Sequence, residues 1–314
     1  MADNIYDFLI IGAGCAGASG GMYASRLNMK TAMVAELPGG LITSTHLVEN
    51  WPGIKSISGP DLAMQLVDHA TSFGAELKNE KVVDISKAVE NVGEGKVSGY
   101  RVKTASNEYL TKTILLATGT LHRKMGVPGE AELENKGVSY CALCDGAFFK
   151  EKVVCVVGGG DSAAKEGIFL SEHASKVYII VRKDVLRAEP VNAERIAKND
   201  KIEILYNTEI AEILGDEKVE KIKLKNGEEM PMDAVFVAIG HNALSELAEK
   251  IGVELNERKE IKINRKTETN VPGVFAAGDV TDTEFKQAIT GSAEAVTASY
   301  FAADYIGKNE VVFE

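Results

Sequence analysis

The feature that most constrains this chain is a glycine-rich turn that follows a short apolar run and occurs twice. The first copy places Gly12, Gly14 and Gly17 directly after the apolar residues 6–11. Glycine lets the backbone turn sharply and approach a pyrophosphate, and the N-terminus of the following helix favours negative charge. Glu36 follows 24 residues after Gly12, where a carboxylate accepts hydrogen bonds from ribose hydroxyls. The pattern predicts a dinucleotide site with a free 2′-hydroxyl, whereas the glycines alone would also fit a plain tight turn.

The second copy carries the opposite charge at the corresponding position. It follows the apolar residues 152–157, and its small residues are Gly158, Gly160 and Ala163. Its basic residues after the next apolar run are Arg182, Lys183 and Arg187. Arg182 follows 24 residues after Gly158, as Glu36 does after Gly12. A base at this position suits a 2′-phosphate. The alternative is that these basic side chains are a solvated strand end.

The order of the apolar runs predicts one domain inserted into another. Residues 113–117 end at Gly119 and residues 234–239 end at Gly240, and the second glycine turn lies between them. Strand–helix–strand units of this kind build parallel sheets covered by helices. We therefore expect an α/β chain with two doubly wound, Rossmann-like dinucleotide-binding domains. Their expected bounds are 1–119 plus 243–314 for the discontinuous domain and 120–242 for the inserted one.

Two of the four cysteines, Cys141 and Cys144, form a C-x-x-C pair. Such a pair predicts a redox-active dithiol, in which one thiolate attacks and the other resolves the mixed disulfide. Zinc would need two more ligands, and Cys15 and Cys155 belong to a glycine turn and an apolar run, so we expect no metal site. Asp145 follows the pair directly. Its carboxyl is placed either to exchange a proton with a leaving thiolate or to cap a turn or helix.

The net charge and the distribution of apolar residues argue against a nucleic-acid-binding protein and a membrane protein. The chain has 314 residues, and its net charge of −11 argues against a nucleic-acid surface. It has no apolar run of the roughly 18 residues that a membrane span needs. Residues 1–7 carry no Lys or Arg, so they lack the basic region of a signal peptide. We expect a cytoplasmic enzyme that binds neither nucleic acid nor membrane.

Seven segments spread over the chain form an ordered set of motifs. They are GAGCAG at 12–17, VENWPG at 48–53, ATGT at 117–120, CALCDGAFF at 141–149, GGGDSA at 158–163, FAAGDV at 275–280 and KQAIT at 286–290. Through this set the chain resembles the low-molecular-weight, prokaryotic-type thioredoxin reductases over essentially its full length. The resemblance implies an FAD domain with an inserted NADPH domain, a homodimer, and thioredoxin or a thioredoxin-like protein as the partner. NADH as the electron donor stays open.

The resemblance also implies roles for individual residues. The implied FAD contacts are Gly12, Gly14, Gly17, Glu36, Asn50, Gly278, Asp279, Gln287 and Ala288. The implied nicotinamide dinucleotide contacts are Gly158, Gly160, Ala163, Arg182, Lys183 and Arg187. Cys144 would face the flavin, Cys141 would exchange with thioredoxin, and Asp145 would be the acid.

The chain departs from the family pattern in the segment expected to bind the 2′-phosphate. Val181 and Lys183 replace a family His and Arg, so the preference for NADPH is expected to be weaker than in relatives with the full motif. Three alternatives stay open: a flavin-dependent dithiol oxidase, a reductase fed by NADH or ferredoxin, and a redox-sensing module without turnover. Arg182 and Arg187 disfavour the oxidase, and the intact turn at 158–163 disfavours a ferredoxin donor.

Overall fold

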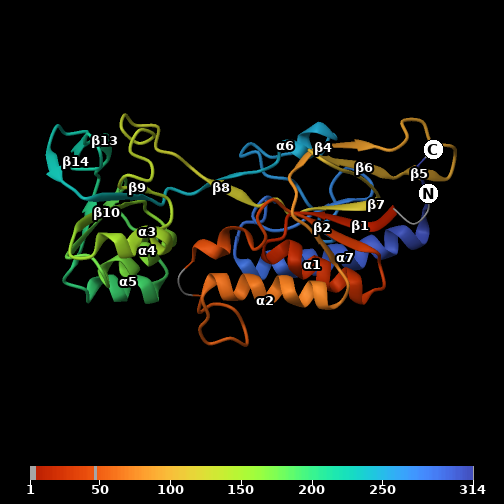
Figure 1. Ribbon diagram of the computed structural model, residues 1–314, viewed down its shortest axis with the longest axis horizontal. Coiled ribbons are helices and arrows are strands. Elements are labelled where there is room, and N and C mark those ends of the chain that lie inside the picture. The colour runs from red at the N-terminus through yellow and green to blue at the C-terminus, as the bar shows by residue number, and fades with distance from the viewer. Residues whose placement is uncertain (1–4, 46–47, 314) are drawn as a thin grey trace. The chain divides into compact units, whose positions relative to one another are not determined.

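The structure, a computed structural model, describes residues 5–45 and 48–313, without the side chains of Leu143 and Cys144. The chain forms two compact units, Met1–Leu121 with Asn242–Glu314, and His122–His241. We call them unit 1 and unit 2 (Figure 1). The bounds expected from the sequence differ from these by one or two residues at each junction.

Unit 1 is built on a mixed sheet whose central strand is β1. The strands run in the order β3 (Glu76–Lys78), β2 (Thr31–Val34), β1 (Ile5–Ile11), β7 (Glu108–Leu116), β6 (Tyr100–Thr104), β4 (Val82–Lys87), with β18 (Val274–Ala276) paired to β7. β1 is parallel to both of its neighbours, whereas β6 is antiparallel to β7 and β4. The helices α1 (Cys15–Arg26), α2 (Gly59–Ser72) and α7 (Ala288–Lys308) lie along one side of the sheet (Figure 1). The remaining elements are η2 (Gly40–Ser44), the strand pair β5 (Lys96–Ser98) and β19 (Glu310–Val312), and α6 (Glu246–Lys250).

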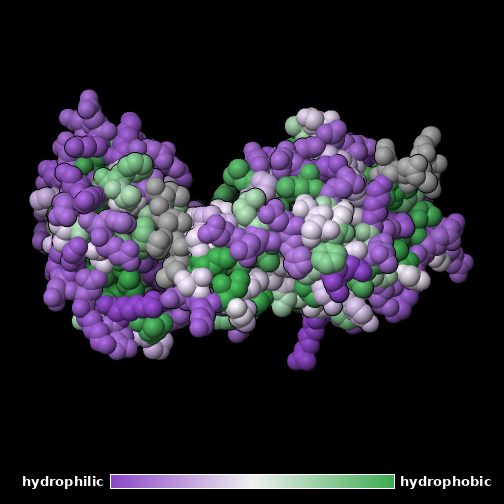
Figure 2. All heavy atoms as spheres, turned by 60° about the horizontal axis from the view of Figure 1, so that its bottom comes forward, coloured by the Kyte–Doolittle hydropathy of each residue, from purple (hydrophilic) through white to green (hydrophobic). Residues whose placement is uncertain are grey.

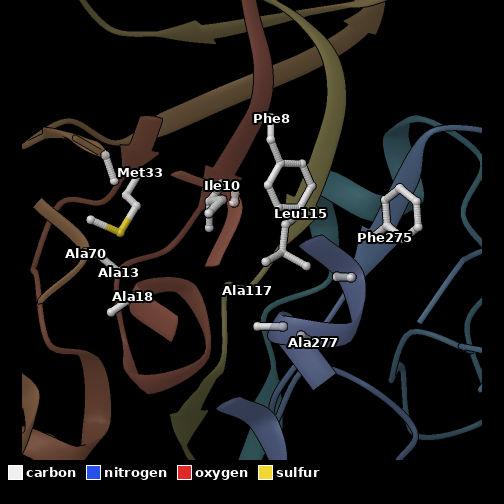
Figure 3. Close-up of a cluster of buried hydrophobic side chains, with 14 of the residues drawn as sticks. Phe8, Ile10, Ala13, Ala18, Met33, Ala70, Leu115, Ala117, Phe275 and Ala277 are labelled. Atoms are coloured by element: carbon white, nitrogen blue, oxygen red, sulfur yellow. The ribbon is translucent and has the colours of Figure 1, made fainter. Parts of the chain in front are cut away.

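The core of unit 1 follows from alternation along β1. Phe8 and Ile10 pack with the helices on one face, where Figure 3 shows them beside Leu115. Leu9 packs into a second cluster on the other face. Burial on both faces explains why residues 8–11 form a continuous apolar run, as parallel strands commonly do.

Unit 2 repeats this plan on a smaller scale. Its parallel sheet has the order β12 (Ile202–Tyr206), β11 (Lys176–Val181), β10 (Val153–Val157), β16 (Ala234–Val237), β9 (Val138–Ser139). Its helices are α3 (Ala142–Asp145), η3 (Gly146–Phe149), α4 (Asp161–Ser171) and α5 (Pro190–Ala197). A separate antiparallel sheet joins β13 (Ile210–Leu214), β14 (Lys221–Leu224) and β15 (Glu229–Pro231). The expected α/β class with two Rossmann-like sheets is confirmed.

Two short strands, β8 (Thr120–His122) and β17 (His241–Ala243), pair where the chain passes between the units. Hydrophilic residues cover most of the visible surface of unit 2, with smaller hydrophobic areas among them (Figure 2). Within the described residues, no helix is both long and apolar enough to cross a membrane.

Candidate functional site

In the glycine turn between β1 and α1, only the second glycine could carry a Cβ without a collision. A Cβ on Gly12, which has a φ of 111°, would lie 2.1 Å from the carbonyl oxygen of Ala117. A Cβ on Gly17 would lie 2.0 Å from the carbonyl oxygen of Gly12. At Gly14, by contrast, the nearest atom is 3.6 Å away. The outer glycines are therefore required by the turn itself, and the middle one leaves the backbone accessible to a ligand, which is the division of roles of a pyrophosphate turn.

The turn between β10 and α4 has the same construction. A Cβ on Gly158 would lie 2.3 Å from the carbonyl oxygen of Ala238 and 2.8 Å from the Cβ of Ala163. Ala163 is fully buried, so its methyl group fills the helix–strand contact. A Cβ on Gly160 would meet nothing within 4 Å. Each unit thus holds one pyrophosphate-type cradle.

The helices that follow the two turns begin without a side-chain cap. Gly14 precedes α1 and Gly160 precedes α4, and neither helix start has a side-chain hydrogen bond to its first N–H groups. These N–H groups have no partner within the helix and favour an anion. Both turns therefore fit the pyrophosphate of a dinucleotide.

The residues expected at the ribose of the first site lie close to its turn. Glu36 follows β2 and is exposed, and its carboxylate lies 3.3 Å from Nζ of Lys81. Three residues further on, the N–H of Gly39 donates to the carbonyl of Ala13 at 2.8 Å. This bond holds the segment that begins with Glu36 beside the glycine turn.

The second site presents a base where the first presents an acid. Arg182 and Lys183 follow β11 directly, and both side chains are exposed, as is that of Arg187. The N–H of Arg187 donates to the carbonyl of Gly159 at 2.9 Å. Bridges of the same parallel type join Gly160 to Arg187 in unit 2 and Gly14 to Gly39 in unit 1.

Two expected flavin residues, Asn50 and Gln287, are in direct contact. Nδ2 of Asn50 donates to Oε1 of Gln287 at 2.8 Å. Gln287 is the N-cap of α7, where its N–H donates to Oγ1 of Thr290 at 3.0 Å in a capping box. Ala288 is the first residue of α7 and is half-buried.

The Gly278–Asp279 segment lies against the start of α1. Gly278 has a φ of 84°, its N–H donates to Glu294 at 2.8 Å, and a Cβ there would lie 3.1 Å from that of Ala16. Burial raises the pKa of the Asp279 carboxyl. Burial, together with the charge of Asp279, raises the pKa of the Cys15 thiol to about 11, so Cys15 is a neutral, free thiol. The structure thus joins the first glycine turn to a segment more than 250 residues later in the chain.

Cys141 takes part in a disulfide, whereas Cys15 and Cys155 have free thiols. The N–H of Cys141 donates to Oγ of Ser139 at 3.0 Å, which fixes the start of α3. The side chain of Cys144 lies outside the described residues, so the role expected for its sulfur stays a prediction. Cys155 is fully buried, which suits a small structural residue.

Asp145 closes α3, and its N–H donates to the carbonyl of Cys141 at 3.2 Å. It also stands at the N-cap of η3, but its side chain makes no capping hydrogen bond there. The capping role that the sequence left open is therefore not realised at η3. Three residues further on, Phe148 is 80% exposed, which is unusual for a phenylalanine.

Sequence reasoning did not find a histidine pair at the paired strands β8 and β17. The ring centroids of His122 and His241 are 4.7 Å apart, and His122 also contacts Tyr140 at 6.1 Å. Burial, the His122 ring and Arg123 lower the pKa of His241 to about 4. The sequence held no signal for this contact, because the two histidines are far apart in the chain.

A second group that the sequence did not reveal is Glu166 on α4. Its Oε2 atom is buried and has no hydrogen-bond partner. Burial raises the pKa of this carboxyl to about 8, so it is largely protonated at neutral pH. A buried, unpartnered carboxyl in a nucleotide-type domain is often functional.

Comparisons with known proteins agree with this geometry. Residues 6–295 match the family described as pyridine nucleotide-disulphide oxidoreductase. The chain belongs to this family. It is therefore an oxidoreductase, and the glycine turns and the disulfide at Cys141 are features of a family named for its nucleotide and its disulphide chemistry.

The similar proteins within this family are thioredoxin reductases. The thioredoxin reductase of Bacillus subtilis (strain 168) is 42% identical over 311 residues, covering 97% of this chain and 96% of that protein. The crystal structure of Lactococcus lactis thioredoxin reductase (FR conformation) matches with a TM-score of 0.90 at 35% identity, over 96% of this chain and 99% of that one. The T. acidophilum thioredoxin reductase matches with a TM-score of 0.88, at the same identity and coverage. The resemblance drawn from the seven sequence segments is confirmed.

Proposed function

We propose that this oxidoreductase is an FAD-dependent thioredoxin reductase that takes electrons from NADPH. The observation that carries the proposal is the combination, within unit 2, of a disulfide at Cys141 and a pyrophosphate-type turn followed by basic residues. A second pyrophosphate-type turn, in unit 1, is followed by the acidic Glu36. Electron transfer from a nicotinamide, through a flavin, to a disulfide requires two nucleotide sites and one redox-active pair. The two turns offer such sites, one followed by an acidic side chain and the other by basic side chains.

Unit 1 supplies the residues that fit FAD. Gly12, Gly14 and Gly17 form the cradle for its pyrophosphate, and Glu36 would accept from ribose hydroxyls. The polar groups at the other end of the site are Asn50, Gly278, Asp279, Gln287 and Ala288. FAD, when bound, supplies the step between a two-electron hydride donor and a disulfide.

Unit 2 supplies the residues that fit NADPH. Gly158, Gly160 and Ala163 form the cradle. Arg182, Lys183 and Arg187 are exposed and close to this turn, where they are free to meet a 2′-phosphate. Arg182 offers a planar fork, while Lys183 offers a point charge. NADPH is therefore the proposed donor, with a preference that Lys183 and Val181 weaken.

The dithiol chemistry follows from Cys141 and from Cys144 on the adjacent helix α3. With the Cys141–Cys144 pair reduced, the Cys141 thiolate attacks one sulfur of the thioredoxin disulfide and forms a mixed disulfide, and the departing thiolate takes up a proton. Cys144 then attacks the Cys141 sulfur and releases the second thioredoxin sulfur as a thiolate. Thioredoxin gains two electrons and the pair returns to its disulfide. Asp145, next to Cys144 in the chain and without a capping bond, is the proposed proton donor.

Phe148 is a proposed contact for the protein substrate. It is 80% exposed and lies only three residues beyond Asp145. Large exposed aromatic side chains commonly anchor protein interfaces. Ala147 offers no aromatic ring and the ring of Phe149 packs against Phe236, so Phe148 alone would carry this contact. The homodimer implied by the resemblance remains part of the proposal, and sedimentation velocity of the purified protein tests it.

The test measures two reactions of the purified protein in parallel. With NADPH and thioredoxin, NADPH oxidation should match the formation of thioredoxin thiols, and Cys141→Ser should abolish both. Cys155→Ala, which changes a buried free thiol, is the matched control and should turn over normally. Rapid oxygen consumption with small dithiols and no nicotinamide would instead identify a dithiol oxidase. Thioredoxin reduction only with reduced ferredoxin would overturn the assignment of the donor.

A further inference from the structure

Lys286 lies in unit 1 between two sets of proposed flavin residues. It directly precedes Gln287, and its ammonium reaches back to the turn that contains Asp279. Nζ of Lys286 donates to Oε1 of Glu260 at 2.5 Å, to the carbonyl of Asp279 at 2.8 Å and to the carbonyl of Thr281 at 2.9 Å. A lysine ammonium has three N–H donors, so all three are used here.

These bonds connect two separate segments of the chain. The Gly278–Asp279 turn has bonds of its own, since Oγ1 of Thr281 donates to the carbonyl of Gly278 at 2.8 Å. Lys286 ties this turn to Glu260, whose side chain is only 14% exposed. The ammonium that holds the turn is itself held in a partly buried ion pair. Such a pair holds its geometry better than an exposed one, because its side chains have fewer alternative positions.

The same ammonium is the positive charge that acts on Asp279. Burial raises the pKa of the Asp279 carboxyl, and Lys286 opposes this rise. At Glu260, burial also raises the pKa, but the hydrogen bonds from Lys286 and Asn256 outweigh it and the pKa falls below its usual value. The other ionisable groups around the turn are Cys15, whose thiol is neutral, Glu294, which accepts from Gly278, Arg258, which faces Glu260, and Asp282, which accepts from Ile263.

We propose that Lys286 is a positioning residue for the flavin: through its bonds to the carbonyls of Asp279 and Thr281 it fixes the Gly278–Asp279 turn, so that the Asp279 carboxyl group is held where it meets hydroxyl groups of the bound cofactor. The proposal rests on the proposed function, because it takes the Asp279 turn to be part of the FAD site. It adds a residue that touches neither nucleotide turn and acts through its neighbours. Lys286 bonds this turn and directly precedes Gln287, which bonds Asn50. Its placement therefore bears on both polar parts of the site.

Four variants separate charge, geometry and folding. Lys286→Met alone would leave Glu260 as a buried unpaired charge and risks unfolding. The informative variant is therefore Lys286→Met with Glu260→Gln, which removes both charges. Glu260→Gln alone keeps the ammonium on the two carbonyls and near Asp279. Lys286→Arg keeps the positive charge, and Asp279→Asn removes the carboxylate on which Lys286 is proposed to act.

The measurement is the dissociation constant of FAD, by fluorescence titration of flavin-depleted protein between pH 5 and pH 8, together with the thermal midpoint of each variant. The double variant should bind FAD about tenfold more weakly at pH 8, because a charge-assisted contact is lost. Without the ammonium, Asp279 takes up its proton at higher pH, so the deficit should widen as the pH falls. Glu260→Gln and Lys286→Arg should stay within about threefold of the wild type. Asp279→Asn, which has no carboxylate to protonate, should bind FAD weakly to a similar extent across this pH range.

Two results would overturn the proposal. One is FAD binding by the double variant within about threefold of wild type at every pH. The other is an equal loss in Glu260→Gln, which would assign the effect to Glu260. Wild-type protein that binds no FAD would instead remove the proposed function itself, and that outcome is visible in the first titration before any variant is compared. A double variant that melts far below Glu260→Gln is replaced by Lys286→Gln combined with Glu260→Gln, which is held to the same two criteria.

Discussion

Asn50 and Gln287 are separated by 237 residues, and Nδ2 of Asn50 donates to Oε1 of Gln287 at 2.8 Å. The bond joins the loop that precedes α2 to the N-terminus of α7, so it links the two chain segments that make up unit 1. Both residues belong to motifs that resemble those of thioredoxin reductases, VENWPG and KQAIT. The contact therefore connects two parts of the proposed flavin site directly.

We expect Asn50→Ala and Gln287→Ala each to weaken FAD binding by about fivefold to tenfold, in line with the roughly 1 kcal/mol that a hydrogen bond contributes. The double variant should lose less than the product of the two, because one bond serves both residues. The matched control is Asn107→Ala, which removes an equivalent bond to Glu80 of 2.9 Å in the same unit. Strictly multiplicative losses would show that the two side chains act independently.

The two cysteines of the C-x-x-C pair should have separate roles. In Cys144→Ser, Cys141 should still attack the thioredoxin disulfide, but without a resolving thiol the mixed disulfide should accumulate. Non-reducing electrophoresis and mass spectrometry detect this adduct, which Cys141→Ser should not form. Wild-type turnover in either variant is incompatible with the dithiol mechanism.

Arg182→Ala should raise the KM for NADPH by about tenfold to a hundredfold and that for NADH little, because a charge-assisted hydrogen bond contributes about 1.5–3 kcal/mol. Lys183→Ala should have a smaller effect, since an ammonium lacks the fork geometry. Lys198→Ala is the control, an exposed lysine that follows α5 in the same unit and pairs with Glu194. Steady-state rates with NADPH and with NADH give the KM of each nucleotide for the wild type and the variants. Equal use of the two by the wild type, with no effect of Arg182→Ala, would point to NADH or another donor.

Glu166 should make the protein less stable at higher pH. Its folded-state pKa is raised to about 8, so the folded state holds a proton that the unfolded state releases near 4.5, the ordinary pKa of a glutamate. Its contribution is fully present below the unfolded pKa and is lost as the pH rises, by up to about 1.4 kcal/mol per pH unit within that window. Glu166→Gln, which keeps the shape and cannot ionise, should therefore gain stability over the wild type from pH 5 to pH 8 in urea unfolding. Glu172→Gln, an exposed change at the end of the same helix, should show no such trend.

The His122–His241 contact should make the protein less stable at lower pH, which is the opposite of the pH dependence expected for Glu166. The pKa of His241 is lowered to about 4, so stability is present above the unfolded pKa near 6.5 and is lost as the pH falls through this window. His122→Phe keeps an aromatic ring against His241 and removes one imidazole. It should raise the thermal midpoint at pH 5 by about 1–3 °C relative to pH 8. His69→Gln, at an exposed histidine of α2, is the control. An equal shift of the thermal midpoint at pH 5 and pH 8 would show that His122→Phe acts through packing and not through the charge of His241.

Local patterns in the sequence were sufficient for the strands and turns that carry the proposed sites. The mostly apolar residues 6–11 lie in β1, and the apolar residues 153–157 form β10, because a strand buried on both faces needs no alternation. Gly12, Gly17 and Gly158 stand where a Cβ would collide with a carbonyl oxygen, so their place in the motif follows from short-range geometry. The charges at Glu36 and Arg182, and the spacing of Cys141 and Cys144, are likewise properties of short segments.

Contacts between distant segments were decided by the tertiary structure alone. The sequence assigned Asn50, Gln287 and Asp279 to a flavin site only through resemblance, and it gave no sign that Lys286 binds Glu260 or that His122 meets His241. It also did not show that Oε2 of Glu166 is buried without a partner. Periodicity and spacing report the backbone within a few residues, whereas hydrogen bonding and burial of a side chain depend on which elements the whole core brings together. The sequence by itself therefore determined the two glycine turns and the cysteine pair. Packing determined which polar groups surround them, because each such contact depends on the burial of segments that are far apart in the chain.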